Sequence, residues 1–439
     1  MKNLPRFPRL PHLLVLGFLL LATSCTDHPD TPQPAPAPSG TAGTPVYSSD
    51  VVTSWLPLQL RLAHSTRFGV VVALRQFAYT GIALYESIVP GYSNYQSIAP
   101  QLNGLPPLPT VTAGASYYRP AAANAAIAAM VRSFNPAASA ADNATIDSLE
   151  AANTALYQRD RPADELARSA GFGQQIAAAV LAWAKTDGSD NATPFVLPAG
   201  AGMWVPTPPN YLPASLPNWG SCRLIVANSD AGTDQIVPVP YSEDPASAYY
   251  AQAREVYDIS QRLTAEQRAT AIYWAINSWP SILRQVLVKE KPSLEVAAAA
   301  MAQSMIAVSD AFVSNYKGKY VYTGLRPVTY IRTVLGQSNW NAVFPTPAHP
   351  EFPSGHAISS GAASESLTLL FGASYAYTDT PFNAAAGSPR LYASFAEAAE
   401  EAAMSRVYAG IHYRPTAEAG IQHGRIIARN VAQKLTFKR

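Results

Sequence analysis

Cysteine is scarce in this sequence, which has only Cys25 and Cys222 in a chain of 439 residues. Two cysteines are too few for a disulfide-stabilised scaffold or for a zinc site built from thiolates. A charge excess of one sign is also lacking, because 31 basic and 29 acidic side chains leave a formal net charge of +2. Nucleic-acid-binding proteins usually show a basic excess, so we expect no nucleic-acid partner.

Charged residues make up only 14% of the chain, whereas hydrophobic residues make up 48%. Such a composition can bury a large core and excludes a chain that is disordered throughout. Beyond the N-terminal segment we find no apolar run long enough to span a bilayer, which takes about 20 residues. We therefore expect a folded domain outside the membrane.

The first 24 residues have the pattern of an export signal. Basic residues precede a short apolar run from Leu13 to Ala22, and small residues then lead to Cys25. This order resembles a lipoprotein signal peptide over 1–24, in which Cys25 is lipidated. The proline-rich stretch 25–45 should form an extended tether. We expect an exported protein whose lipid anchor holds it on the bacterial cell envelope, the alternative being an ordinary cleaved signal.

The remaining residues, 46–439, show helical periodicity. Apolar residues from Leu74 to Ile88 recur every three or four positions, which predicts a buried amphipathic helix. Ser293 is a suitable N-cap for a further helix. Alanine-rich segments predict three more helices, at 119–133, 140–157 and 163–185.

Sustained apolar–polar alternation is lacking, so no sheet is expected. The proline-rich stretch 194–240 predicts a long surface loop or cap. The sequence therefore predicts an all-α domain over 46–439, namely a large antiparallel helix bundle, or two packed bundles, with long proline-rich loops.

Three short segments near the C-terminus carry residues suited to binding an anion. In the first, Lys319 and Arg326 can direct two cations at one point. In the second, Ser354 is a natural N-cap and is followed by Gly355 and His356. The backbone N–H groups at such a helix start favour an anion, and a glycine allows the anion to approach closely.

The third segment contains Arg406, whose guanidinium suits tetrahedral oxyanions, and His412 six residues later. Together the segments supply three cations, two histidines and a helix N-terminus. A site for a phosphate-like trianion requires this set, because one histidine can bind or attack the central atom while the other transfers protons.

The motifs Lys-x6-Arg-Pro, Pro-Ser-Gly-His and Ser-Arg-x5-His resemble, in order and spacing, the signature of one superfamily. It contains type 2 phosphatidic acid phosphatases, bacterial acid phosphatases and vanadium-dependent haloperoxidases. The resemblance implies that the three cations hold the anion's oxygens and that Ser354 and the Gly355 amide hydrogen-bond the anion. It also implies that His412 is the vanadate ligand, or the nucleophile of a phosphatase, and that His356 is the acid–base residue.

Segments at 77–87, 204–209 and 309–311 also look like those of bacterial haloperoxidase-like proteins. The resemblance therefore implies a vanadate-dependent enzyme that oxidises halide with hydrogen peroxide. His349 stands where bromoperoxidase-type members carry His and the chloroperoxidase carries Phe, so we expect bromide or iodide as substrate. Two alternatives stay open: a phosphomonoesterase that forms a phosphohistidine from a phosphate ester, and an exported binding protein with a decayed site.

One position departs from the family. Members usually carry Asp four residues after the last histidine, where this chain has Thr416. Thr416 could cap the helix at 417, and Glu418 could replace the carboxylate if the backbone allowed it. We expect that His412, without a carboxylate partner, is a weaker vanadate ligand and that Thr416→Asp tightens binding.

Overall fold

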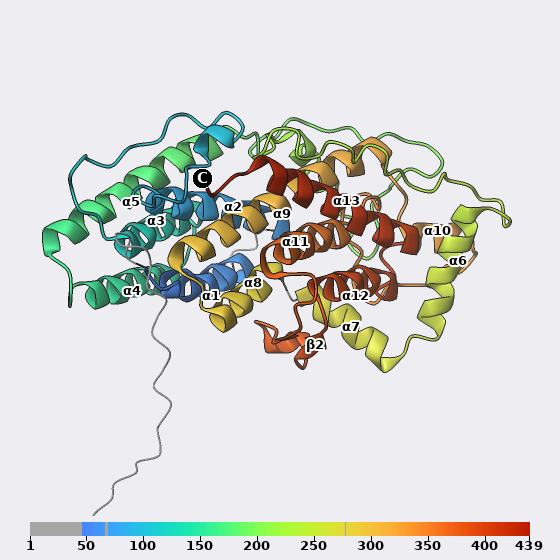
Figure 1. Ribbon diagram of the computed structural model, residues 1–439. Helices are drawn as coiled ribbons and strands as arrows, with labels where there is room; N and C mark the ends of the chain where they lie inside the picture. Colours follow the sequence, from blue (N-terminus) through green and yellow to red (C-terminus); the bar gives the residue numbers. More distant parts are fainter. Residues whose placement is uncertain (1–45, 66–68, 277) are drawn as a thin grey trace, which may run out of the picture. The chain divides into compact units, whose positions relative to one another are not determined.

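The protein is described here by a computed structural model, which covers residues 46–65, 69–276 and 278–439. The expected signal peptide, Cys25 and the tether lie outside these described residues. Over the described ranges the chain forms thirteen α-helices, one small sheet and three short 3-10 helices (Figure 1). The predicted all-α class is therefore confirmed.

The elements follow one another along the chain with mostly short connections. The helices are α1 (Asp50–Ser65), α2 (Val70–Ile88), α3 (Arg119–Phe134), α4 (Ala140–Tyr157), α5 (Ala163–Ala184), α6 (Ala248–Gln261), α7 (Ala265–Ile276), α8 (Trp279–Glu290), α9 (Leu294–Tyr322), α10 (Pro327–Thr333), α11 (Gly355–Phe371), α12 (Phe395–Tyr408) and α13 (Arg414–Lys434). The 3-10 helices are Ala99–Gln101, Trp219–Ser221 and Ala384–Ala386.

The sheet is a feature that the sequence did not predict. Strands β1 (Tyr377–Asp379) and β2 (Arg390–Tyr392) pair antiparallel, with Tyr377 opposite Tyr392. Each strand has three residues, which is too short to produce a visible period of two.

The predicted helices lie close to where the sequence placed them. Helix α4 matches 140–157, and α3 and α5 each differ from prediction by one residue at the C-terminal end. The proline-rich stretch 194–240 contains a 3-10 helix at 219–221 and an isolated bridge from Met203 to Gly324, and is otherwise irregular, as expected for a loop. It nevertheless packs firmly on the domain, because Trp204 and Trp219 are buried.

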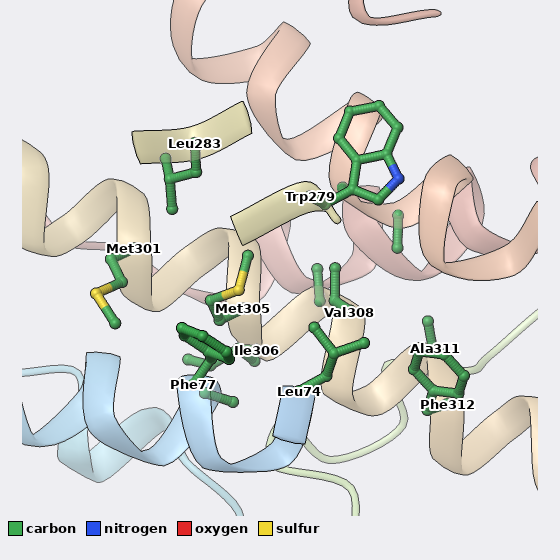
Figure 2. Close-up of a cluster of buried hydrophobic side chains, with 14 of the residues drawn as sticks. Leu74, Phe77, Trp279, Leu283, Met301, Met305, Ile306, Val308, Ala311 and Phe312 are labelled. Carbon is green, nitrogen blue, oxygen red and sulfur yellow. The ribbon is translucent and has the colours of Figure 1, made fainter. Parts of the chain in front are cut away.

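Helix α9 is the central element of the core. It packs against α2 and also against α11 and α13. Figure 2 shows part of the buried cluster to which Leu74 and Phe77 of α2, Leu283 of α8, and Met305 and Ile306 of α9 belong; all five side chains are buried.

The length and apolar composition of α9 would also suit a membrane span, contrary to the sequence expectation. However, 89% of its most apolar window is buried inside the fold. Polar residues such as Gln303 and Asp310 interrupt its apolar runs, so inspection of the sequence predicted the helix but not its length as an apolar segment. Its apolar character is that of a core helix.

Close packing of α11 against α13 brings the second and third motifs together. Gly361 of α11 and Gly424 of α13 have no room for a Cβ, which would overlap the backbone of Ile421 and Ile358, respectively. Two helices approach this closely only where a glycine removes the side chain between them. The start of α11 is thereby held beside the connection that enters α13.

Candidate active site

The expected site residues stand at helix ends. Lys319 lies in the last turn of α9, and Arg326 is the N-cap of α10. Pro327 explains the second placement, since the residue before a proline favours extended backbone and a proline favours the first helical turn. Ser354 is the N-cap of α11, so Gly355 and His356 form its first turn, as predicted.

The third motif spans the end of α12 and the connection to α13. Arg406 lies in the last turn of α12. Gly410 follows with φ +77°, a conformation that favours glycine, and the chain turns there toward His412. Pro415 lies in the first turn of α13, whose N-cap is Tyr413. His412 therefore sits in a short segment fixed at both ends.

Arg326 joins two of the expected histidines. Its Nη1 donates to the carbonyl of Ile411 at 2.7 Å and faces His412 Nε2 at 3.2 Å. Its Nε donates to the carbonyl of His349 at 2.9 Å, and its Nη2 donates to His349 Nδ1 at 3.0 Å. The guanidinium thus fixes the first motif against the third.

Lys319 and Arg406 are held by backbone carbonyls. The Lys319 ammonium donates to the carbonyls of Pro350, Glu351 and Pro353, just before α11. Arg406 donates to the carbonyl of Ala271 at 2.8 Å. Both side chains are buried, and so is Arg326.

Burial of three cations makes this site strongly electropositive. Burial lowers the pKa of Lys319 well below its ordinary value. It also lowers the pKa of Arg326 to about 10 and that of Arg406 to about 9. Among the described residues, Glu351 is the carboxylate that opposes this effect at Lys319 and Arg326. Since one carboxylate does not balance three cations, the site favours a bound anion.

The three histidines of the site are neutral in this environment. Burial, together with the neighbouring cations, lowers the pKa of His349 and His412 well below 6.5. Burial and Arg406 lower the pKa of His356 to about 3, although a hydrogen bond with the Trp274 backbone acts in the opposite direction. A bound anion would raise these pKa values and allow a histidine to carry a proton.

His412 has a carboxylate partner, contrary to the sequence expectation. Its Nδ1 lies 2.8 Å from Glu351 Oε1, and the carboxylate is buried. Thr416 donates to Glu351 Oε2 at 3.1 Å and does not cap the helix, because the N-cap is Tyr413. Glu418 is exposed on α13, so it does not replace the missing aspartate. The expectation of a weaker ligand therefore loses its basis.

Sequence inspection missed Glu351 because its partner lies 61 residues away and belongs to another motif. The available signal was an acidic residue between Pro350 and Phe352-Pro353, in the short connection that leads to Ser354. Pro350 and Pro353 restrict the backbone of this connection, although they do not by themselves show where the Glu351 side chain points.

The ring of His412 is oriented for binding through Nε2. A carboxylate accepts hydrogen bonds, so the Glu351 contact keeps the imidazole proton on Nδ1. Nε2 then carries a lone pair directed into the cationic site. With Lys319, Arg326 and Arg406, this donor set fits an oxyanion such as vanadate or phosphate.

His349 is not a freely solvated loop residue. Its side chain is half-buried, accepts the bond from Arg326 and lies 5.7 Å, ring to ring, from Tyr316. It therefore belongs to the wall of the site.

Comparison with known proteins agrees with this geometry. Residues 299–438 match the family described as the VCPO second helical-bundle domain. No curated protein gives a significant match. The structure resembles the first bacterial vanadium-dependent iodoperoxidase, with 29% sequence identity, a TM-score of 0.82 and coverage of 91% of this chain and 99% of that chain.

The holo and apo forms of a bacterial vanadium-dependent chloroperoxidase share the fold at 17% identity, with TM-scores of 0.64 and 0.63. Each match covers 83% of this chain. It covers 92% of the holo chain and 94% of the apo chain. The family match over residues 299–438, the fold and the motif order all match the superfamily of vanadium-dependent haloperoxidases and type 2 phosphatidic acid phosphatases that the sequence resembles.

Proposed function

We propose that this protein is a vanadate-dependent haloperoxidase that oxidises bromide or iodide with hydrogen peroxide. The observation that carries the proposal is the neutral His412 ring, whose Nε2 lone pair faces buried cations. Similarity to an iodoperoxidase over nearly the whole of both chains supports it. Bound vanadate would supply the Lewis-acidic centre that activates peroxide.

The residues of this chain would divide the work of the site. His412 would hold the central atom, while Lys319, Arg326 and Arg406 would hold its oxygens by charge-assisted hydrogen bonds. Ser354 and the Gly355 amide, at the start of α11, would contribute further donors. His356, in the same turn and half-buried, would transfer protons.

His349 would set the halide preference. Its neutral ring places a polar group in the wall of the site, where the chlorinating members carry an apolar Phe. We infer activity with bromide or iodide and little with chloride.

A phosphomonoesterase is the second candidate, because the same three cations and the His412 lone pair also suit phosphate. In that reaction His412 would attack phosphorus, and His356 would protonate the leaving alcohol. The third candidate, a binding protein with a decayed site, rested on the apparent loss of a carboxylate at Thr416. The contact between Glu351 and His412 removes that support.

The two enzymatic candidates are separated by assaying one preparation for both reactions. Protein purified without vanadate is divided, and one half is loaded with orthovanadate. Each half is tested with peroxide plus iodide, bromide or chloride, and with a phosphate ester. We expect iodide and bromide oxidation only in the loaded half, absent in His412→Ala. Phosphate ester hydrolysis in the unloaded half, without halide oxidation in the loaded half, would establish the phosphatase.

A further inference from the structure

The Glu351 side chain ties the connection before α11 to the start of α13. Its Oε1 accepts hydrogen bonds from His412 Nδ1 at 2.8 Å and from the Tyr413 N–H at 3.2 Å. Its Oε2 accepts from Thr416 Oγ1 at 3.1 Å. The carboxylate is 3% exposed, and three donors from one five-residue segment surround it.

The backbone of Glu351 is fixed as well. Its N–H donates to the carbonyl of Gly324 at 2.8 Å, and its carbonyl accepts from the Lys319 ammonium at 3.2 Å. Both partners belong to the first motif. Glu351 therefore connects the first motif to His412 through its main chain and its side chain together.

We propose that Glu351 is the positioning residue of His412 and replaces, from a different segment, the aspartate that relatives carry at position 416. Its carboxylate fixes the proton on Nδ1, holds the ring plane and leaves Nε2 as the binding atom. This inference rests on the proposed function only in taking an oxyanion at His412 Nε2; it does not depend on which reaction follows.

Thr416 suits this arrangement because its hydroxyl donates a hydrogen bond to the Glu351 carboxylate. An aspartate at 416 would bring a second carboxylate close to Glu351 Oε2, which now accepts the Thr416 hydroxyl at 3.1 Å. Two carboxylates so close cannot both ionise without mutual repulsion, whereas a hydroxyl donates to the first. Thr416→Asp alone should therefore weaken vanadate binding, the reverse of what the sequence suggested.

The test is a swap of the carboxylate between the two positions. Orthovanadate and inorganic phosphate dissociation constants are measured by calorimetry for wild type, Glu351→Gln, Thr416→Asp and the double variant. Each single variant should bind about 10–100-fold more weakly. The double variant, with its carboxylate at 416, should recover most of the loss. Glu418→Gln, on the exposed face of α13, is the matched control and should bind as wild type does.

Nitrogen NMR of the histidine rings gives a readout independent of activity. In wild type, His412 should be a single Nδ1-protonated tautomer; Glu351→Gln should mix the tautomers, and the double variant should restore one. Losses in the two single variants that simply add in the double variant would overturn the inference. So would tighter vanadate binding by Thr416→Asp alone, a result that decides the matter even if Glu351→Gln does not fold.

Failure of this inference is distinguishable from failure of the proposed function. Wild type that binds both anions but oxidises no halide refutes the haloperoxidase, while the four affinities still test Glu351. Wild type that oxidises halide, combined with no recovery in the double variant, refutes only the role of Glu351.

Discussion

Gly424 of α13 lies directly against the backbone of Ile358 of α11. A Cβ at position 424 would overlap the Ile358 carbonyl oxygen and stand 2.5 Å from the amide nitrogen of Ala362. The contact is between two backbones, so no flexible side chain can move aside. Because α11 begins at Gly355 and α13 follows His412, this approach sets the distance between the two halves of the site.

Gly424→Ala should therefore destabilise the protein. Overpacking a close contact costs about 1–3 kcal/mol, and here the helices themselves must separate. The matched control is Gly171→Ala in α5, where a Cβ would meet nothing within 4 Å. That variant should gain about 0.5–1 kcal/mol, since glycine is unfavourable inside a helix. Denaturant unfolding checks both, and equal stabilities would contradict this account of the packing.

Acid should destabilise the protein partly through His423. Its Nε2 lies 2.7 Å from Ser314 Oγ, and burial lowers the ring pKa to about 4. The unfolded chain takes up this proton below its ordinary pKa of about 6.5, and the folded chain only below about 4. Stability is therefore fully present above pH 6.5 and falls as the pH is lowered toward 4.

His423→Gln removes this titration. Between pH 6.5 and 4 the unfolding free energy of the variant should fall less steeply than that of wild type. The difference between the two slopes should reach at most about 1.4 kcal/mol per pH unit. Chemical denaturation at pH 7, 6 and 5 measures the difference, and parallel curves for the two proteins would exclude a role for His423.

Exchanging His349 should change the halide preference. His349→Phe removes the polar ring but leaves the bond from Arg326 Nε to the backbone carbonyl at position 349. We expect the ratio of chloride to bromide rates to rise, with little change in vanadate affinity. Steady-state rates for three halides test this, and equal chloride and bromide rates in wild type would remove His349 as the determinant.

We propose that Cys25 anchors the exported protein to the cell envelope. Cys25→Ala should stop lipidation and move the protein to the soluble fraction, because the variant lacks the attached lipid. Stable anchoring generally needs two attached lipid chains or signals. The control is Cys222→Ala, since Cys222 is a buried free thiol of the folded domain. Fractionation of cells measures the outcome, and wild type that is fully soluble after export would refute the anchor.

Local patterns predicted about half of the helices and the residues of the three motifs. Helix α4 was recognisable because it is rich in alanine, and α2 because apolar residues recur along it every three or four positions. Helix α9 is buried all round, so its periodicity says little about its neighbours.

The role of Glu351 was not predictable from any local pattern. Its partners, His412 and Thr416, lie in a segment that reaches it only because α11 packs on α13. From the motif alone, Thr416 looked like a lost carboxylate. In the fold it is a hydrogen-bond donor to a carboxylate supplied from elsewhere in the chain.

We propose that His412 binds vanadate and that His356 transfers protons. Calorimetric titration with orthovanadate, followed by iodide oxidation on the same samples, tests it most directly in wild type, His412→Ala and His356→Ala. We predict one equivalent bound in wild type, loss of binding in His412→Ala, and retained binding with lost turnover in His356→Ala. Vanadate binding by His412→Ala that is as tight as in wild type would contradict the account.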